Sequence, residues 1–570
     1  MFDYKEGIVS SLDGAIEALD ADTIGEMLEI PPQREMGDYA FPTFTLAKVF
    51  RKSPNQIAAE LKEQLGEVPA IEEIRVQGPY LNFFIDKDHL AREVLEDLRR
   101  RGEDFGKVDV GQNRQVVMEY SSPNIAKPFH IGHIRTTVIG DSLKRIYDYL
   151  GYNTVSINHL GDYGTQFGMM INAYLKWGDP EVIEKNPIPE LVKLYVRINK
   201  EAEENPELLD ESRNWFKRLE EQDEEAVALW QWFRDVSLKE FKRVYELLDI
   251  EFDSYRGESF YTDLMPEAVE EMKEKGILVE SKGAQIVNLD EYKLPPAIII
   301  KSDGSTIYLT RDIATALYRK KTYDFYKSVY VVASQQNLHF QQLFAILDKM
   351  GHEWVKDCEH VSFGMVSLKD GTLSTRRGKV VYLEDVLKRA TDKVEEILIQ
   401  REEETGKAVE NRRALAQTVG IGAVKFQELF NQRIKDYVFD WDRTLSFDGE
   451  TGPYVQYTHA RIASLLEKGN FQVDGPIKIE ELDQALAHEI LAQLYGFHQV
   501  VVDAHEKNEP YFITRYIVET AKLFNKYYNS TPIITEDAEA TNTRLFLSYG
   551  VKTLIKVGLS LLGIGAPEKM

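Results

Sequence analysis

The sequence predicts a protein of three parts: an α+β N-terminal unit, a central α/β domain on a parallel sheet, and an all-α C-terminal bundle. Three observations predict this fold class. Short β-rich apolar runs alternate with helical periodicity in the middle of the chain. From residue 384 onward the periodicity is helical throughout. The chain has 570 residues, and at ~150 residues per domain this length accommodates three or four domains.

The N-terminal unit is predicted to span residues 1–107. Apolar residues recur at helical spacing over 8–28 and 57–65. Two strand-like runs follow at 74–77 and 81–85, separated by Gly78 and Pro79. We interpret the charged stretch 99–107 as a linker to the next domain.

The central domain is predicted to span residues 108–440. A β-rich run at 115–118, a loop with two prolines, a helix over 134–150 and a strand over 153–158 begin a Rossmann-like, nucleotide-binding sheet. A Glu-rich, helical insertion is expected near 180–280. The α/β pattern is expected to resume with strands at 297–300, 328–333 and 360–366.

The C-terminal domain is predicted to span residues 441–570 as a helical bundle. Helical periodicity in the last third of the chain covers 394–401, 412–433, 454–468, 482–508, 513–528 and 543–562.

Composition narrows the class of protein. Hydrophobic residues make up 43% of the chain and charged residues 29%, as in ordinary globular proteins. The single cysteine, Cys358, excludes an internal disulfide and cysteine-rich zinc sites. Neither a signal peptide nor a membrane span is expected, so we predict a cytoplasmic protein.

The net charge of −25 argues against nucleic-acid binding when it is taken as a total. The charge is unevenly distributed, however. Segments 114–145 and 301–380 are net positive, whereas 181–300 is strongly negative. Because binding depends on where charge lies, the total does not exclude an RNA partner, and it favours a selective one.

The motif with the clearest chemistry is Ser-Pro-Asn-Ile-Ala-Lys-Pro-Phe-His-Ile-Gly-His over residues 122–133. It lies between the first α/β strand and its helix, where open parallel sheets bind ligands. His130 and His133 are positioned to donate hydrogen bonds to phosphate at a helix N-terminus. Gly132 would let a nucleotide approach the backbone. The alternative is a pair of histidines that cap the helix.

Two further segments fit a phosphate and cation site. Leu-Ser-Thr-Arg-Arg-Gly at 373–378 resembles a mobile clamp on pyrophosphate, or else a solvated basic loop. Tyr308 and Asp312 share a helix face at i and i+4. With Glu119 and Gln336, which follow other strands, they would form an anionic pocket suited to a planar guanidinium. The alternative is a capping acid beside a core tyrosine.

These segments together resemble the arginyl-tRNA synthetases, a family of class I aminoacyl-tRNA synthetases, over essentially the whole chain. Residues 119–135 are similar to the family's form of the "HIGH" signature, and 373–378 occupy the place of the "KMSKS" signature. Residues 158–168 and 308–314 are also typical of the family.

The resemblance implies a role for each matching residue. Lys127, His130 and His133 would be catalytic, with Lys127 compensating for a lysine that the 373–378 loop lacks. Asp312 would bind the substrate guanidinium. ATP would be bound by His130, Gly132, His133, Ser374, Thr375 and Arg376. Arginine would be bound by Glu119, Ser122, Pro123, Asn124, His133, Tyr308, Asp312 and Gln336.

The resemblance also implies partners: tRNA(Arg), L-arginine and ATP with Mg²⁺, without protein-bound zinc. The reaction would form arginyl-adenylate and then arginyl-tRNA, and activation of arginine would require bound tRNA. The N-terminal unit would contact the tRNA elbow through Tyr80 and Asn82, as an exposed ring and amide suit a looped-out base. The C-terminal bundle would bind the anticodon. We expect a monomer and no membrane partner.

Three other functions remain open from the residues alone. The first is a nucleotidyltransferase that uses the His-x-Gly-His motif, which leaves the helical C-terminal third unexplained. The second is a non-catalytic RNA-binding paralogue, which the intact His130 and His133 disfavour. The third is a synthetase for a different amino acid, from which Asp312 and Glu119 would distinguish this chain.

Overall fold

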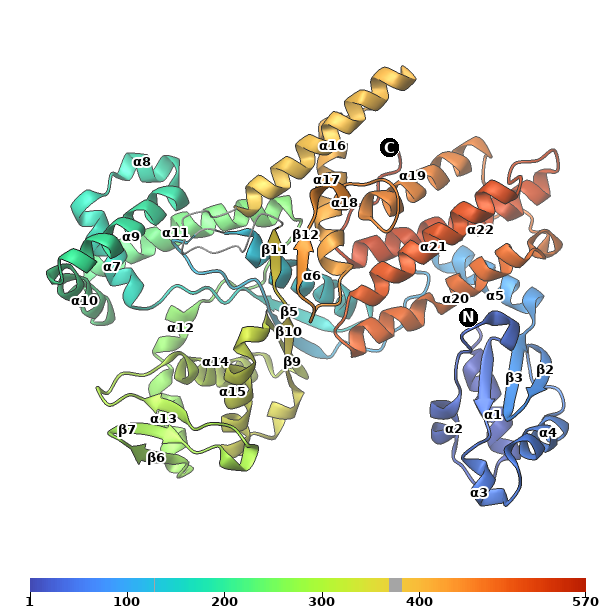
Figure 1. The fold of residues 1–570 in the computed structure, drawn as a ribbon, viewed down its shortest axis with the longest axis horizontal. Helices are drawn as coiled ribbons and strands as arrows, with labels where there is room; N and C mark the ends of the chain where they lie inside the picture. The colour runs from blue at the N-terminus through green and yellow to red at the C-terminus, as the bar shows by residue number, and fades with distance from the viewer. Residues whose placement is uncertain (128, 369–381) are drawn as a thin grey trace.

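The computed structural model describes residues 1–127, 129–368 and 382–570. The three predicted parts are confirmed (Figure 1). The N-terminal unit projects from the C-terminal helices, while the helical insertion extends from the opposite side of the central domain. The predicted linker at 99–107 is wrong in part, because helix α5 (Lys87–Arg101) continues through its first residues. Leu90, Leu95 and Leu98 of α5 are buried, so the connection is a packed helix.

The N-terminal unit contains a three-stranded antiparallel sheet in the order β1-β3-β2. The predicted helical segment 8–28 divides into two helices. Helix α4 (Pro54–Leu65) begins with a capping box in which Ser53 and Gln56 each accept a hydrogen bond from the other's backbone N–H. The elements before α5 are α1 (Tyr4–Ala15), α2 (Ala21–Met27), β1 (Tyr39–Pro42), α3 (Leu46–Phe50), α4 (Pro54–Leu65), β2 (Ile71–Gln77) and β3 (Tyr80–Ile85).

The central sheet has four parallel strands in the order β10-β9-β4-β5. Strand β4 is an inner strand, and Val116, Val117 and Met118 are fully buried, as expected for a parallel sheet covered on both faces. The elements of this core are β4 (Gln115–Glu119), α6 (Ile134–Tyr149), β5 (Asn153–Ile157), α14 (Tyr308–Tyr323), β9 (Lys327–Ala333), α15 (Asn337–Lys349) and β10 (Cys358–Phe363).

The strand predicted at 297–300 exists, but its predicted place in the parallel sheet is wrong. It forms β8 of a separate antiparallel sheet in the order β6-β7-β8. Ala297 and Ile299 are buried, whereas Ile298 is 44% exposed. This apolar run therefore forms a strand with one face packed in the protein and the other face open to solvent. This part comprises α12 (Glu258–Thr262), α13 (Met265–Glu274), β6 (Leu278–Ser281), β7 (Ala284–Val287) and β8 (Ala297–Ile300).

The insertion is helical, as predicted. Its longest helix, α11, begins at the side-chain cap of Asp223 and packs Phe233 and Phe241 into the main core. The helices are α7 (Thr165–Trp177), α8 (Pro180–Lys185), α9 (Pro187–Glu204), α10 (Glu207–Glu220) and α11 (Glu224–Leu247).

Over the described residues 382–570 the regular elements are helices except for β12, which the periodicity did not predict and which pairs in parallel with β11. Helix α22 lies at the centre of the bundle and is buried along most of its length. The elements are β11 (Val366–Leu368), α16 (Leu383–Thr405), α17 (Arg412–Leu429), β12 (Tyr437–Phe439), α18 (Trp441–Thr444), α19 (Gly452–Lys468), α20 (Ala485–Glu506), α21 (Tyr511–Ser530) and α22 (Ala538–Leu561).

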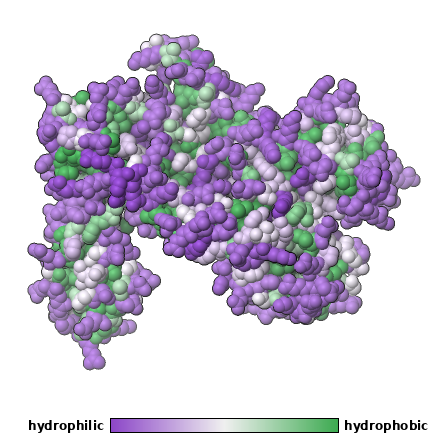
Figure 2. All heavy atoms as spheres, turned by 180° about the vertical axis from the view of Figure 1, so that it is seen from behind, coloured by the Kyte–Doolittle hydropathy of each residue, from purple (hydrophilic) through white to green (hydrophobic). Residues whose placement is uncertain are grey.

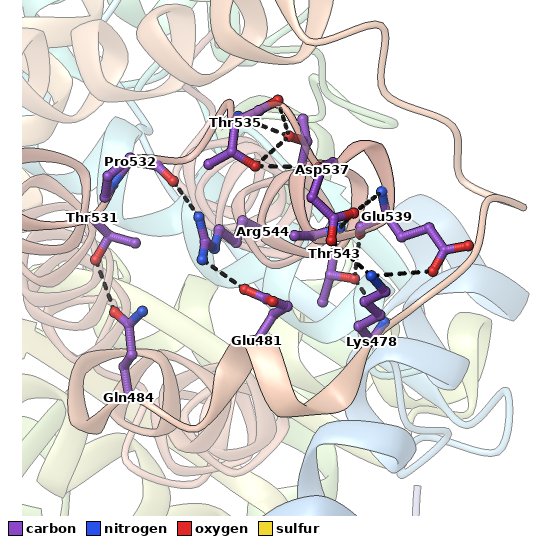
Figure 3. A network of polar contacts seen from close by, with 12 residues as sticks. Lys478, Glu481, Gln484, Thr531, Pro532, Thr535, Asp537, Glu539, Thr543 and Arg544 are labelled. Atoms are coloured by element: carbon purple, nitrogen blue, oxygen red, sulfur yellow. Dashed lines mark hydrogen bonds and ion pairs between the residues drawn. The ribbon is translucent and has the colours of Figure 1, made fainter.

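A polar network fixes the start of α22 to neighbouring segments (Figure 3). Arg544 donates to Glu481 at 2.6 Å and to the backbone carbonyl of Pro532. Lys478 donates to Asp537, the N-cap of the helix, at 2.7 Å. These contacts hold the segment before α20 and the end of α21 on one helix.

Hydrophilic side chains cover most of the face seen in Figure 2, and apolar atoms form scattered patches. Across the described ranges, no helix is both long and apolar enough to cross a membrane.

Candidate active site

The predicted site lies at the carboxyl ends of the central strands. Glu119 is the last residue of β4. Gln336 ends the short turn that follows β9 and is exposed. The chain passes from β4 to β5 on one side and later returns to β9 on the other side of β4. Such a reversal creates the crevice in which open α/β sheets bind ligands.

The backbone that follows β4 is strained. Ser121, Ser122 and Ala126 have φ of 70°, 47° and 55°, a left-handed conformation that costs roughly 1–2 kcal/mol for each non-glycine residue. Helix α6 holds this conformation in place. The Ser121 N–H donates to Thr136 Oγ1 at 3.0 Å, and its hydroxyl lies 2.8 Å from that of Thr137.

His130 and His133 lie together at the start of α6, with ring centroids 4.0 Å apart. The Nδ1 atom of His130 accepts from the Gly132 N–H at 3.1 Å, and the Nδ1 atom of His133 accepts from the His130 N–H at 3.2 Å. A neutral imidazole that accepts at Nδ1 carries its proton on Nε2. The backbone therefore selects the tautomer in which both histidines donate from Nε2.

Burial favours the neutral form of both histidines. Burial lowers the pKa of His130, and burial together with the neighbouring His130 lowers the pKa of His133 to about 3. Gly132 is required for this geometry, because a Cβ atom there would lie 2.8 Å from Cε1 of His130. The space that this glycine provides is thus occupied by the ring of His130, where the sequence predicted a nucleotide.

The predicted clamp residues Ser374, Thr375 and Arg376 lie outside the described residues. The segment that follows them reaches the signature motif, since Tyr382 pairs with His130 and the Leu383 N–H donates to the Phe129 carbonyl at 2.9 Å. Lys127 is exposed on the signature motif itself. Its positive charge lowers the pKa of His133 and of Glu258, though for both groups burial is the larger influence.

The residues predicted to surround arginine are brought together in part. Tyr308 and Asp312 begin α14 on one face, and Tyr308 is 60% exposed. Asp312 accepts a hydrogen bond from His339 Nε2 at 2.6 Å. Glu119 is buried and forms an ion pair at 2.6 Å with Arg319, whose side chain is fully buried. Glu119 is therefore already neutralised within the chain.

Ser122, Pro123 and Asn124 lie on the loop that follows β4. Pro123 and Asn124 pair with Gly161 through backbone contacts, and Asn124 is exposed. A Cβ atom at Gly161 would lie 2.3 Å from Oδ1 of Asn124. The 158–168 motif thus supports the Asn124 side chain.

Three pocket residues were missed by the sequence analysis: Arg319, His339 and Glu258. Arg319 lies two helical turns after Asp312, and His339 lies three residues after Gln336, so spacing could have indicated both. Glu258 gave no sequence signal. It forms an ion pair with Arg311 at 3.1 Å, and burial raises its pKa to about 7 although Arg311 opposes the shift.

The predicted RNA contacts of the N-terminal unit differ in exposure. Tyr80 is partly exposed and its ring meets the 52% exposed Phe44 edge to face at 5.5 Å. The expected exposure of Asn82 is wrong, because this residue is only 4% exposed. The backbone around Gly37 covers it, since a Cβ there would lie 3.3 Å from the Asn82 Cβ. A tRNA contact at Asn82 stays a prediction.

Within the part of the chain that the structure describes, no three His, Cys, Asp or Glu side chains cluster so as to hold a metal ion.

The parallel sheet, the paired histidines at a strand end and the appended helical bundle define a class I aminoacyl-tRNA synthetase. A family model of the class I (R) tRNA synthetase catalytic domain matches residues 96–441. Models of the arginyl tRNA synthetase N-terminal domain and of the DALR anticodon-binding domain match 4–85 and 455–570. The chain belongs to the arginyl-tRNA synthetase family.

Similar proteins agree over the whole length. The chain is 55% identical to the arginine–tRNA ligase of Halothermothrix orenii and 54% identical to that of Clostridioides difficile, and both comparisons cover 100% of each chain. The solved arginyl-tRNA synthetase of Plasmodium falciparum is 25% identical, with a TM-score of 0.83 over 99% of this chain and 98% of that one.

Proposed function

We propose that this protein attaches L-arginine to tRNA(Arg) in two steps that use ATP. The proposal is carried by the Asp312 carboxylate at the start of α14, together with the two histidines at the start of α6, whose Nδ1 atoms accept from the backbone. One half of the crevice suits a cationic side chain, and the other suits a triphosphate.

The first step joins arginine to AMP. A carboxylate oxygen of arginine attacks the α-phosphorus of Mg-ATP in line, and the bond to the bridging oxygen breaks to release pyrophosphate. Negative charge on the phosphate oxygens is stabilised by the Nε2–H groups of His130 and His133, by Lys127, and by Ser374, Thr375 and Arg376 of the clamp loop. Placement of the two reactants supplies much of the remaining acceleration.

The second step transfers the arginyl group to RNA. The 2′-hydroxyl of the terminal tRNA adenosine attacks the adenylate carbonyl, and AMP leaves with the phosphate oxygen. This chemistry requires no covalent enzyme intermediate. The protein contributes orientation and stabilisation of the departing phosphate.

Selection of arginine would depend on pocket geometry. Asp312 presents a carboxylate to a planar, bidentate donor, with Tyr308 beside it. Lysine offers a single ammonium that cannot satisfy both carboxylate oxygens in that geometry, so binding discriminates without an editing domain. Ser122, Pro123, Asn124, Gln336 and Glu119 would surround the remainder of the amino acid.

The RNA would span the molecule. The partly exposed Tyr80, supported by Phe44, suits a stacked base of the tRNA elbow. The C-terminal helices would bind the anticodon, and bound tRNA would be required before arginine is activated. We further infer a cytoplasmic monomer without bound zinc, and sedimentation measures the oligomeric state directly.

The proposal is tested by ATP–pyrophosphate exchange with purified protein, each amino acid in turn, and with or without tRNA(Arg). We expect arginine, and no other amino acid, to support exchange. We expect this exchange only when tRNA(Arg) is present. Exchange driven by a different amino acid would overturn the substrate assignment. Rapid exchange without tRNA would overturn the RNA requirement and leave the substrate assignment in place.

A further inference from the structure

Each of three carboxylates on the cation-facing side of the crevice has a cationic partner within the chain. Glu119 pairs with Arg319 at 2.6 Å, and Glu258 pairs with Arg311 at 3.1 Å. Asp312 pairs with His339 at 2.6 Å. With all three partners charged, the pairs sum to zero net charge. A pocket in that state has no excess negative charge for a substrate cation.

The three partners differ in whether they can lose their charge. Guanidinium groups stay protonated in proteins, so the charges of Arg311 and Arg319 are permanent. An imidazolium releases its proton near neutral pH. When His339 is neutral and Glu258 is ionised, the same three pairs carry one net negative charge, which a substrate guanidinium can complement.

The Asp312–His339 pair is also the one that a ligand can reach. The side chains of Asp312 and His339 are 31% and 25% exposed, whereas those of Glu119 and Arg319 are 11% and 0% exposed. A guanidinium that enters from solvent therefore meets the Asp312 carboxylate while the His339 imidazole already bonds to it.

The surroundings of His339 hold its proton in the free protein. Burial by itself would lower its pKa, but the hydrogen bond and charge of Asp312 on α14 outweigh it, and Glu119 on β4 adds to the increase. His360 on β10 also faces this residue, and burial lowers the pKa of His360, so it adds no positive charge near neutrality. His159, which follows β5, and Arg319 act on the pair through Asp312. Burial lowers the pKa of His159.

We propose that arginine binding expels a proton from His339, because the substrate guanidinium replaces the imidazolium as the cationic partner of Asp312. His339 is thus a proton-linked positioning residue: it holds the Asp312 carboxylate before substrate arrives and couples arginine affinity to pH. The inference rests on the proposed function, since it requires that Asp312 binds arginine. Arginine affinity then falls about tenfold for each pH unit below the pKa of His339.

The test is isothermal titration of the tRNA-bound protein with arginine between pH 6 and pH 8.5, in two buffers that differ in ionisation heat. The wild type is expected to release protons on binding at the acidic end. Glu258 titrates in the same range, so the decisive quantity is the difference between wild type and His339→Asn. That difference should approach one proton per arginine. In His339→Asn, the kcat for charging at saturating arginine should change far less than the KM for arginine.

His352→Asn is the matched control. His352 lies 3.0 Å from Glu271, a second histidine–carboxylate pair outside the crevice, and its loss should leave proton release unchanged. Equal proton release by wild type and His339→Asn would overturn the inference, and so would wild-type affinity that does not vary with pH. The pH dependence of the wild-type affinity remains a test even if His339→Asn fails to bind arginine. Failure of the wild type to charge tRNA with arginine at any pH would instead overturn the proposed function.

Discussion

Replacement of Gly132 by alanine tests the geometry of the paired histidines. The new Cβ would lie 2.8 Å from Cε1 and 2.9 Å from Nδ1 of His130, closer than non-bonded atoms approach. The ring must rotate away, and the 3.1 Å bond from the Gly132 N–H is lost with it. His130 then no longer directs Nε2–H at the phosphate. Loss of one such donor to a developing anion costs about 10²–10³-fold in rate.

The assay is single-turnover formation of arginyl-adenylate in the presence of tRNA(Arg). We expect a reduction of about 10²–10³-fold for Gly132→Ala. Gly14→Ala is the control, because a Cβ at Gly14 on α1 meets nothing within 4 Å. A Gly132→Ala protein that stays folded and forms adenylate within threefold of the wild-type rate would refute the role given to His130.

Three other substitutions test a phosphate contact, a buried ion pair and a base-stacking contact. Lys127→Ala should slow adenylate formation about tenfold or more in the same assay, by loss of a charge-assisted phosphate contact; an unchanged rate would remove Lys127 from catalysis. Arg319→Met should lower the free energy of unfolding by about 3–5 kcal/mol in denaturant titrations, because it leaves buried Glu119 unpaired. Replacing both residues by Met should recover most of that loss. Tyr80→Ala should raise the KM for tRNA by the equivalent of about 1–3 kcal/mol, and Tyr80→Phe should not; equal KM values would exclude base stacking at Tyr80.

Local sequence patterns predicted the elements that position the site. The β-rich run 115–118 and the helix over 134–150 correspond to β4 and α6, and the signature motif lies between them. Tyr308 and Asp312 share the first turns of α14, as their spacing predicted. These predictions succeeded because they depend on neighbours within a few residues.

The partners of the site residues could not be predicted from periodicity, because they arise from contacts distant in sequence. Glu119 and Arg319 meet across 200 positions when β4 and α14 pack on one sheet. The burial of Asn82 similarly depends on the backbone near Gly37, which precedes its strand by more than 40 residues. For strand β8, an uninterrupted apolar run did not reveal that one face stays open.

We expect the crevice around Asp312 to select a guanidinium. The most direct measurement compares kcat/KM for charging of tRNA(Arg) with arginine and with citrulline, which has nearly the same shape but carries an uncharged ureido group. We expect a preference for arginine of about 10⁴-fold or more, because the Asp312 carboxylate would be left without its cation. Comparable kcat/KM values for the two would contradict it.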